Sequence, residues 1–155
     1  MNVSIGKKAP VFSLPDHNNE TCKLSSLQGS VVVVYFYPKD DTSTCTQQAC
    51  DYRDHHEWFE GEGVRVIGIS PDSVASHAKF RTKHGLNFTL LADEDHAVCE
   101  KYGVWQEKSM YGRKYMGVVR STVVIDAKGI VRAVFSPVTM KTHVADIEAA
   151  VKACS

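Results

Sequence analysis

A run of seven β-branched and aromatic side chains at residues 31–37 constrains the fold more than any other segment. It reads Val-Val-Val-Val-Tyr-Phe-Tyr without polar alternation, a pattern that is typical of a strand buried on both faces. Pro38 follows at once and ends the strand, because proline has no backbone N–H to donate to a neighbouring strand. The chain must therefore supply layers that cover both sides of a central sheet.

Further strand, helix and hairpin patterns follow this run along the chain. Strand patterns cover residues 64–70 and 88–92, and helical patterns cover about residues 45–60, 71–84, 94–102 and 142–153. Residues 121–126 and 130–135 alternate around an Ala-Lys-Gly turn, which is typical of a hairpin. Strand–helix–strand–helix followed by a hairpin predicts an α/β fold with a mixed central sheet and helices on both faces.

Length and charge narrow the possible functions. The 155 residues suit one domain, residues 1–155, without linkers or repeats. Eighteen basic residues balance eighteen acidic ones, so no global field favours nucleic acid or an anionic membrane as a partner. No stretch has the length of a membrane span, and the first residues lack the apolar core of a signal peptide. We therefore expect a cytoplasmic protein.

The chain has five cysteines. An odd number without a secretion signal argues against a structural disulfide framework and leaves packing, metal binding or redox chemistry. His55 and His56 lie near Cys45 and Cys50, but this spacing fits no familiar zinc site, so we expect no metal. The three remaining cysteines are expected to pack or to be incidental: Cys22, Cys99 and Cys154.

Residues 38–50 join the buried strand to a helix, at the edge where α/β sheets usually carry their sites. Thr44-Cys45-Thr46-Gln47 fits a capping box, which predicts Thr44 as N-cap and Cys45 as the first helical residue. The sulfur would then lie beside unpaired N–H groups and the positive end of the helix dipole, which favour the thiolate. The alternative is a buried structural cysteine, which the polar neighbours disfavour.

Cys50 lies five residues after Cys45. On a regular helix this separation corresponds to a rise of about 7.5 Å and a rotation of about 140°, so the two Cα atoms would be about 8–9 Å apart. A disulfide requires Cα atoms within about 7 Å. A bond between the two cysteines therefore requires the start of the helix to unwind. The alternative is that Cys50 only fills space.

Pro38, Thr42 and Cys45 together match the Pro-x-x-x-Thr-x-x-Cys signature of the peroxiredoxins. The chain resembles the bacterioferritin comigratory (peroxiredoxin Q) type, in which many members carry the resolving cysteine where Cys50 stands. The resemblance covers nearly the whole chain, with its main matches at residues 6–12, 35–53, 66–72, 102–105 and 110–126. It implies a thioredoxin-like fold and hydroperoxides as substrates.

The resemblance also implies a role for each site residue. Cys45 would be the nucleophile that becomes a sulfenic acid, with Arg120 holding the thiolate and polarising the peroxide. Thr42 would hydrogen-bond at the sulfur and the peroxide, and Pro38 would shield the sulfur from water. Cys50 would then form the 45–50 disulfide of an atypical 2-Cys enzyme, which thioredoxin or a similar dithiol reduces. No cofactor is implied, and a monomer is favoured.

Four positions depart from the pattern of the family. Ser43 and Thr44 replace a common Pro-Gly pair, Gln48 stands where Glu is usual, and Asn87 replaces a common Pro before Phe88.

Two rival functions stay open on the residues alone. One is a protein thiol-disulfide oxidoreductase, although such enzymes usually carry Cys-x-x-Cys, which is absent here. The other is a redox-sensitive chaperone or binding module, which would need neither Thr42 nor Arg120.

Overall fold

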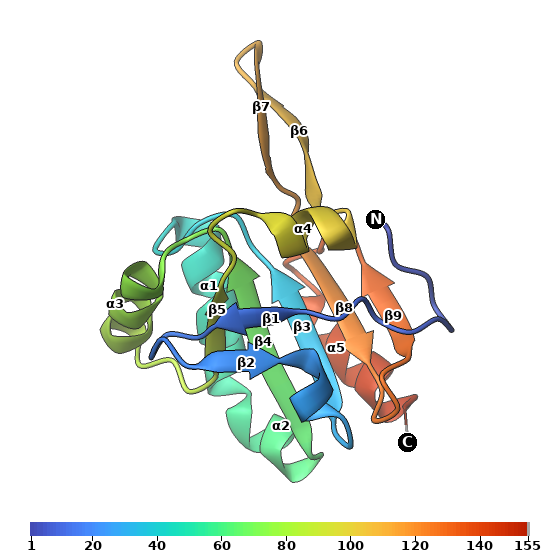
Figure 1. The fold of residues 1–155 in the computed structure, drawn as a ribbon. Helices are drawn as coiled ribbons and strands as arrows, with labels where there is room; N and C mark the ends of the chain where they lie inside the picture. The colour runs from blue at the N-terminus through green and yellow to red at the C-terminus, as the bar shows by residue number, and fades with distance from the viewer. Residues whose placement is uncertain (155) are drawn as a thin grey trace.

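Five strands form the central sheet of the computed structural model, which describes residues 1–154 (Figure 1). The strands lie in the order β5-β4-β3-β8-β9. They are β3 (Val31–Phe36), β4 (Val64–Ser70), β5 (Thr89–Ala92), β8 (Ser121–Ile125) and β9 (Val131–Phe135). β3, β4 and β5 pair in parallel, whereas β8 is antiparallel to both β3 and β9. The predicted mixed sheet is confirmed.

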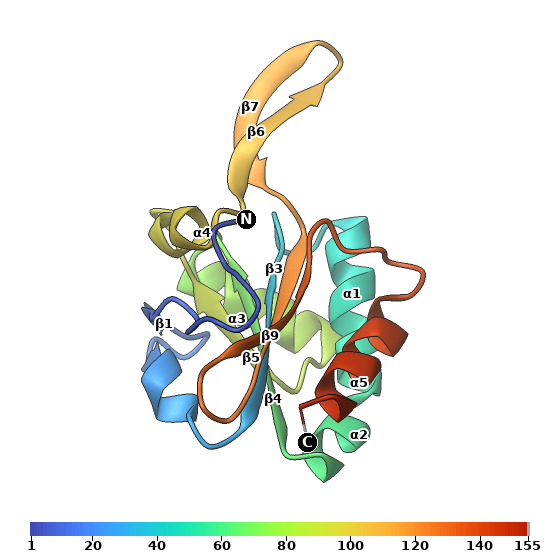
Figure 2. The same ribbon diagram turned by 90° about the vertical axis from the view of Figure 1, so that its right-hand side faces the viewer.

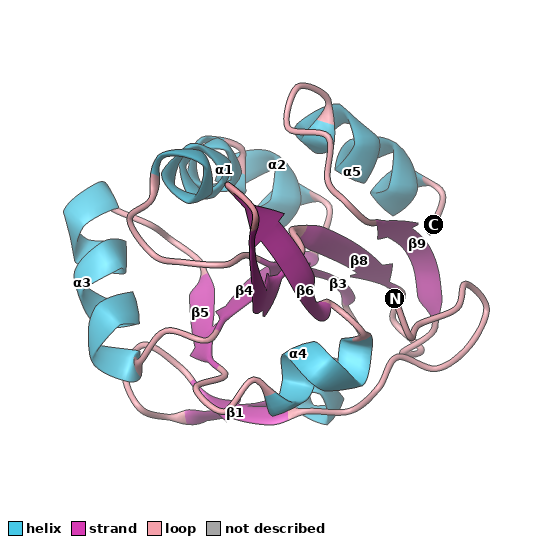
Figure 3. Ribbon diagram, turned by 90° about the horizontal axis from the view of Figure 1, so that it is seen from above, coloured by secondary structure: helices cyan, strands magenta, loops and turns pink. Residues whose placement is uncertain are grey.

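Helices cover both faces of this sheet, as predicted. They are α1 (Ser43–Asp54), α2 (His56–Gly61), α3 (Val74–His84), α4 (Ala97–Tyr102) and α5 (His143–Lys152), with a 3-10 helix η1 (Leu24–Leu27). Figure 3 shows α1, α2 and α5 on one side of the sheet and α4 on the other. No helix in the described part of the chain is long and apolar enough to cross a bilayer.

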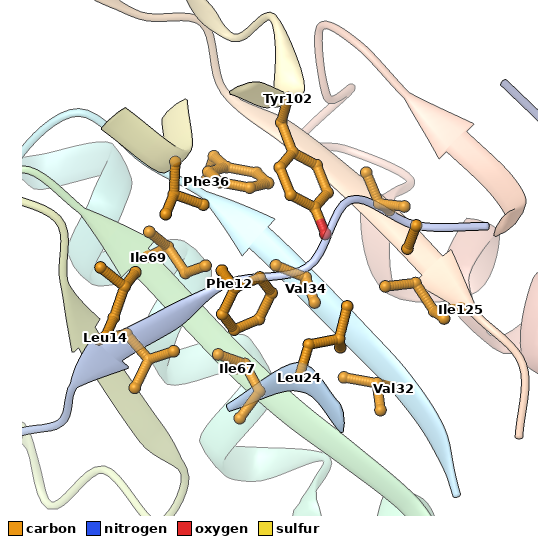
Figure 4. Close-up of a cluster of buried hydrophobic side chains, with 14 of the residues drawn as sticks. Phe12, Leu14, Leu24, Val32, Val34, Phe36, Ile67, Ile69, Tyr102 and Ile125 are labelled. Atoms are coloured by element: carbon orange, nitrogen blue, oxygen red, sulfur yellow. The ribbon is translucent and has the colours of Figure 1, made fainter. Parts of the chain in front are cut away.

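The central strand β3 sends alternate side chains into two cores, which explains its uninterrupted apolar sequence. Val32, Val34 and Phe36 join the core under α4 and η1, where Tyr102 and Phe12 also pack (Figure 4). The opposite face of β3 carries Val33 and Tyr35. They join the core under α1, α3 and α5, together with Tyr37. Burial on both faces of residues 31–37 is therefore confirmed, apart from a half-buried Val31.

Two hairpins lie outside the central sheet. β1 (Ser13–Pro15) and β2 (Thr21–Lys23) pair beside β5. β6 (Trp105–Met110) and β7 (Arg113–Val118) extend away from the body of the molecule (Figures 1 and 2). Neither of these two hairpins was predicted. Most side chains of the β6–β7 hairpin are exposed, so its sequence lacks the alternation of apolar and polar residues that marks a half-buried strand.

Three predicted helix boundaries are wrong, and one of them is the start of the helix expected at residue 94, which begins at Ala97. The pattern over residues 45–60 is two helices, because His55 leaves the helical conformation between α1 and α2. The helix expected from residue 71 starts at Val74, where the Ser73 side chain accepts a hydrogen bond from the Ser76 N–H. Asp72 lies outside this helix, since its carboxylate accepts hydrogen bonds from Ser70 and from the loop before α1.

Gly68 allows the closest packing within the sheet. It lies in β4 between Tyr35 and Leu90, and an added Cβ would stand 2.9 Å from a carbon of each side chain. We expect Gly68→Ala to lower the free energy of unfolding by about 1–3 kcal/mol, because a filled core must shift to accept it. Denaturant unfolding measures this change.

Gly61→Ala is the matched control, because a Cβ at this helical position meets nothing within 4 Å. It should leave stability unchanged or raise it by up to about 1 kcal/mol through helix propensity. Equal effects of the two substitutions would contradict the packing argument.

Candidate active site

Cys45 lies in the first turn of α1, although the predicted cap is wrong. The N-cap is Thr42, whose backbone is extended (φ −84°, ψ 157°) and whose carbonyl accepts a hydrogen bond of 2.8 Å from the Thr46 N–H. Thr44 is therefore inside the helix and Cys45 is its third residue. The sulfur remains next to the free N–H groups of the helix start, with no acidic side chain in that turn.

Arg120 contacts the sulfur directly. Its Nη2 donates to Cys45 Sγ at 3.3 Å, and its Nη1 donates to Gln48 Oε1 at 2.7 Å. Cys45 is only 1% exposed and Gln48 is fully buried. The guanidinium is thus held at two points, and its permanent positive charge favours a thiolate at Cys45.

The sheet explains how Arg120 reaches a residue 75 positions away. Antiparallel pairing of β3 with β8 sets Phe36 opposite Ser121. Arg120, one residue before β8, therefore lies level with the chain that leaves β3 toward α1. Gln48 is one helical turn after Cys45 and shares its side of α1. The sequence analysis noted Gln48 only as a departure from the family. Its i, i+3 spacing from Cys45 could have indicated that the two side chains share one face of the helix.

A buried polar network anchors the loop between β3 and α1. The Asp40 carboxylate accepts a hydrogen bond of 2.6 Å from Tyr37 and one of 2.8 Å from Ser76. His77 Nδ1 lies 2.7 Å from the same carboxylate. The Asp40 backbone N–H donates to Asp72 at 2.8 Å. The loop that leads into the helix of Cys45 is therefore held by α3 and by the segment between β4 and α3, as a preorganised site requires.

His77 is the centre of this network and is fully buried. Its Nε2 lies 2.9 Å from the Leu91 carbonyl, which can only accept, so Nε2 carries a proton. Asp40, Asp72 and His77 also form the group of side chains, in the described residues, that is close enough to hold a metal ion. Each of these three side chains already hydrogen-bonds to a neighbouring residue: Asp40 to Tyr37, Asp72 to Ser70 and His77 to Leu91. The group is therefore suited to anchoring the loop before α1.

The other predicted site residues belong to the same segment of the chain as Cys45, residues 38–50. Pro38 is half-buried at the end of β3. Thr42 is exposed, and its hydroxyl donates to the Lys39 carbonyl at 2.9 Å, so a hydrogen bond from Thr42 to sulfur stays a prediction. Cys50 is half-buried in the same helix, and both thiols are free. Since α1 is continuous between them, their Cα atoms are about 8–9 Å apart.

The core that contains Cys45 also contains two buried tyrosines, which add no negative charge near the sulfur. Tyr35 and Tyr52 stack with ring centroids 4.6 Å apart, and burial raises the pKa of both phenols, which therefore stay neutral. Burial raises the pKa of each of the three remaining thiols, which favours the protonated form over the reactive thiolate. They are Cys22, Cys99 and Cys154.

Comparison with known proteins agrees with this geometry. Residues 5–134 match the AhpC/TSA family. The putative peroxiredoxin bcp of Coxiella burnetii is 46% identical, over 95% of this chain and 97% of that protein. Peroxiredoxin Bcp of Bacillus subtilis is also 46% identical, over 94% of this chain and 93% of its own length.

Solved structures show the same fold. Xanthomonas campestris peroxiredoxin Q superposes with a TM-score of 0.87 at 35% identity, over 92% of this chain and 90% of that one. A variant of Xylella fastidiosa PrxQ has a TM-score of 0.92 at 29% identity, over 99% of this chain and 98% of that one. The fold is therefore that of the thioredoxin-like peroxiredoxins, and the chain belongs to the AhpC/TSA family as a peroxiredoxin of the bacterioferritin comigratory, or peroxiredoxin Q, group.

Proposed function

We propose that this chain reduces hydroperoxides with Cys45 as the nucleophile and Cys50 as the resolving residue. As a peroxiredoxin of this group it is a thiol-dependent peroxidase, and the proposal names its residues, substrates and reductant. The observation that carries it is the 3.3 Å contact of Arg120 Nη2 with Cys45 Sγ in the first turn of α1. A cation and a helix start meet at this thiol, and both favour the nucleophilic thiolate.

In the first step the Cys45 thiolate attacks the terminal oxygen of the peroxide. The O–O bond breaks, and the departing oxygen takes a proton and leaves as water or an alcohol. Cys45 becomes a sulfenic acid. Arg120 stays hydrogen-bonded to Gln48 at 2.7 Å, so it can polarise the peroxide without reorganising. The network at Asp40 supports this step because it holds the loop before α1 in place.

Hydrogen peroxide and organic hydroperoxides are the substrates that we propose. The Xanthomonas campestris bacterioferritin comigratory protein, which is 34% identical, has alkyl peroxide reduction activity. The attacked O–O bond is common to both classes, and the group beyond it affects binding more than chemistry.

In the second step the Cys50 thiol attacks the sulfenic acid, and the products are a disulfide and water. The two cysteines lie about 8–9 Å apart on an intact helix, so the first turns of α1 must unwind. Ser43 and Thr44 are exposed, so little packing opposes this change. We expect α1 to be helical when reduced and locally unfolded when oxidised.

A dithiol such as thioredoxin would reduce the disulfide by thiol exchange. The five free cysteines suit a reducing compartment, which supports a cytoplasmic location. We propose a single domain that acts as a monomer, because Cys45, Cys50 and Arg120 all come from one chain around one sheet.

Reaction with one equivalent of hydroperoxide tests the cycle. Mass spectrometry of the reduced protein should find rapid peroxide loss and a disulfide between Cys45 and Cys50. Cys50→Ser should stop at a Cys45 sulfenic acid that a dimedone-type reagent traps. Cys99→Ser is the control and should behave as wild type. Peroxide consumption by Cys45→Ser at the wild-type rate would refute the proposal and favour one of the rival functions.

Hydrogen exchange tests the unwinding of α1. The Thr46 N–H is bonded to the Thr42 carbonyl at 2.8 Å in the reduced helix. We expect the amides of residues 46–50 to exchange faster after oxidation, because these helical bonds must break to form the disulfide. After oxidation, the Cys50→Ser variant should keep the amide protection of the reduced wild-type protein, because it cannot form the disulfide. A disulfide that leaves the protection of α1 unchanged would contradict the mechanism.

Arg120→Lys tests whether the reaction depends on the two contacts that the guanidinium makes with Gln48 and Cys45. Lysine keeps the positive charge but cannot donate to Gln48 and Cys45 at once. We expect the second-order rate constant with hydrogen peroxide to fall about 100-fold, the lower end of the effect of losing one preorganised donor, because lysine keeps the charge. Stopped-flow kinetics measures it, and Arg113→Lys on the exposed hairpin should change nothing. Full activity of Arg120→Lys would rule out a role for the two-point contact.

A further inference from the structure

We propose that Lys108, on the β6–β7 hairpin, is a second cation of the active site that stabilises negative charge at Cys45. This inference rests on the proposed function, because it assigns Lys108 to the same thiol. It gives the hairpin, which contributes little to either core, a part in the reaction.

The hairpin adjoins the site through the chain itself. β7 ends at Val118, and only Val119 separates it from Arg120. The Val119 N–H donates to the Val104 carbonyl at 2.8 Å, which closes the base of the hairpin against the body. In Figure 3 the hairpin stands between α1 and α4, above the end of the sheet where α1 begins.

The side chain of Lys108 leans toward this base. Its paired residue across the hairpin is Tyr115, whereas its Cδ would lie 3.3 Å from a Cβ on Gly117, two residues nearer to the body. The same Cβ would be 3.4 Å from the Tyr115 ring. Gly117 therefore leaves the space through which the lysine stem runs toward the base of the hairpin, three residues before Arg120.

Lys108 differs from the other charged residues of the hairpin. It is half-buried, whereas Glu107, Arg113 and Lys114 are exposed. Glu107 and Lys114 pair with each other at 3.9 Å on the opposite face. Within residues 1–154, no carboxylate forms an ion pair with Lys108 and no acceptor hydrogen-bonds to it. A partly desolvated ammonium without a partner is costly unless negative charge develops beside it.

The electrostatic neighbours of Lys108 are the reacting groups. Burial lowers the pKa of Lys108, the charge of Arg120 lowers it further, and the charge of Cys45 opposes both. Tyr35 is the other titratable group beside Cys45, and burial raises its pKa so that it stays neutral. Arg120, the residue before β8, thus contacts the sulfur at 3.3 Å, and Lys108 on β6 is a second cation whose charge interacts with that of Cys45.

The two cations suit different stages of the attack. Arg120 is bound to both Gln48 and the sulfur, so it stays with the thiolate. Lys108 belongs to the projecting hairpin, and its flexible stem lets the ammonium follow charge that moves from sulfur to the departing oxygen.

Lys108→Met and Lys108→Arg test the inference, with Lys114→Met as the matched hairpin control. Stopped-flow kinetics with hydrogen peroxide over a range of pH and the ultraviolet absorbance of the thiolate are the readouts. At neutral pH we expect Lys108→Met to react about three- to tenfold more slowly, the size of a partly screened charge interaction. The deficit should shrink at alkaline pH, and Lys108→Arg should restore the wild-type profile.

Gly117→Ala provides a second route that keeps the lysine. Its Cβ meets the stem of Lys108 at 3.3 Å, so it should displace the ammonium and slow the reaction in the same direction. Added to Lys108→Met, it should cause no further loss.

Two results would overturn the inference. One is a Lys108→Met profile identical to wild type, and the other is an equal loss in Lys108→Met and Lys108→Arg, which indicates packing alone. Failure of the proposed function is distinct, because it appears as undiminished peroxide consumption by Cys45→Ser, whatever the result at Lys108.

Discussion

Antiparallel pairing between β3 and β8 is the constraint on which the site depends. It sets Phe36 opposite Ser121, and so brings the residue before β8 to the chain that leaves β3. The contact between Arg120 and Cys45 follows from this register. A shift by one residue would turn every side chain of β8 to the other face and separate the pair. The chemistry of the thiol is thus tied to the packing of the two cores, which determine that register.

The helix α1 carries two requirements that oppose each other. Its intact first turn presents Cys45 to N–H groups and to Arg120, whereas a disulfide with Cys50 needs that turn to open. The surroundings divide these tasks. The loop before α1 is anchored through Asp40 and His77 in a buried network, while the exposed Ser43 and Thr44 leave the helix start lightly packed. A fixed loop beside a soft first turn suits a cycle of folding and local unfolding.

Sequence patterns predicted most of the fold, and they failed where several local signals competed. The sequence at Thr44 fits a capping box, yet the N-cap of α1 is Thr42. The backbone of Thr42 is extended, and its hydroxyl is bonded to Lys39 in the loop before the helix. The break at His55 and the delayed start of α3 at Val74 also depend on contacts that no local pattern contains. The β6–β7 hairpin was missed because its two faces are largely exposed.

The sequence alone determined the buried strand at residues 31–37, the mixed sheet, the place of Cys45 in the first turn of a helix and its separation from Cys50, because these depend on periodicity and spacing along one segment. Only the tertiary structure decided how the sulfur is held. The resemblance implied Arg120, but the contacts of its guanidinium with both Cys45 and Gln48 depend on strand register and on side-chain direction. Those are properties of the packed sheet, since residues far apart in sequence acquire a common position only when their strands pair.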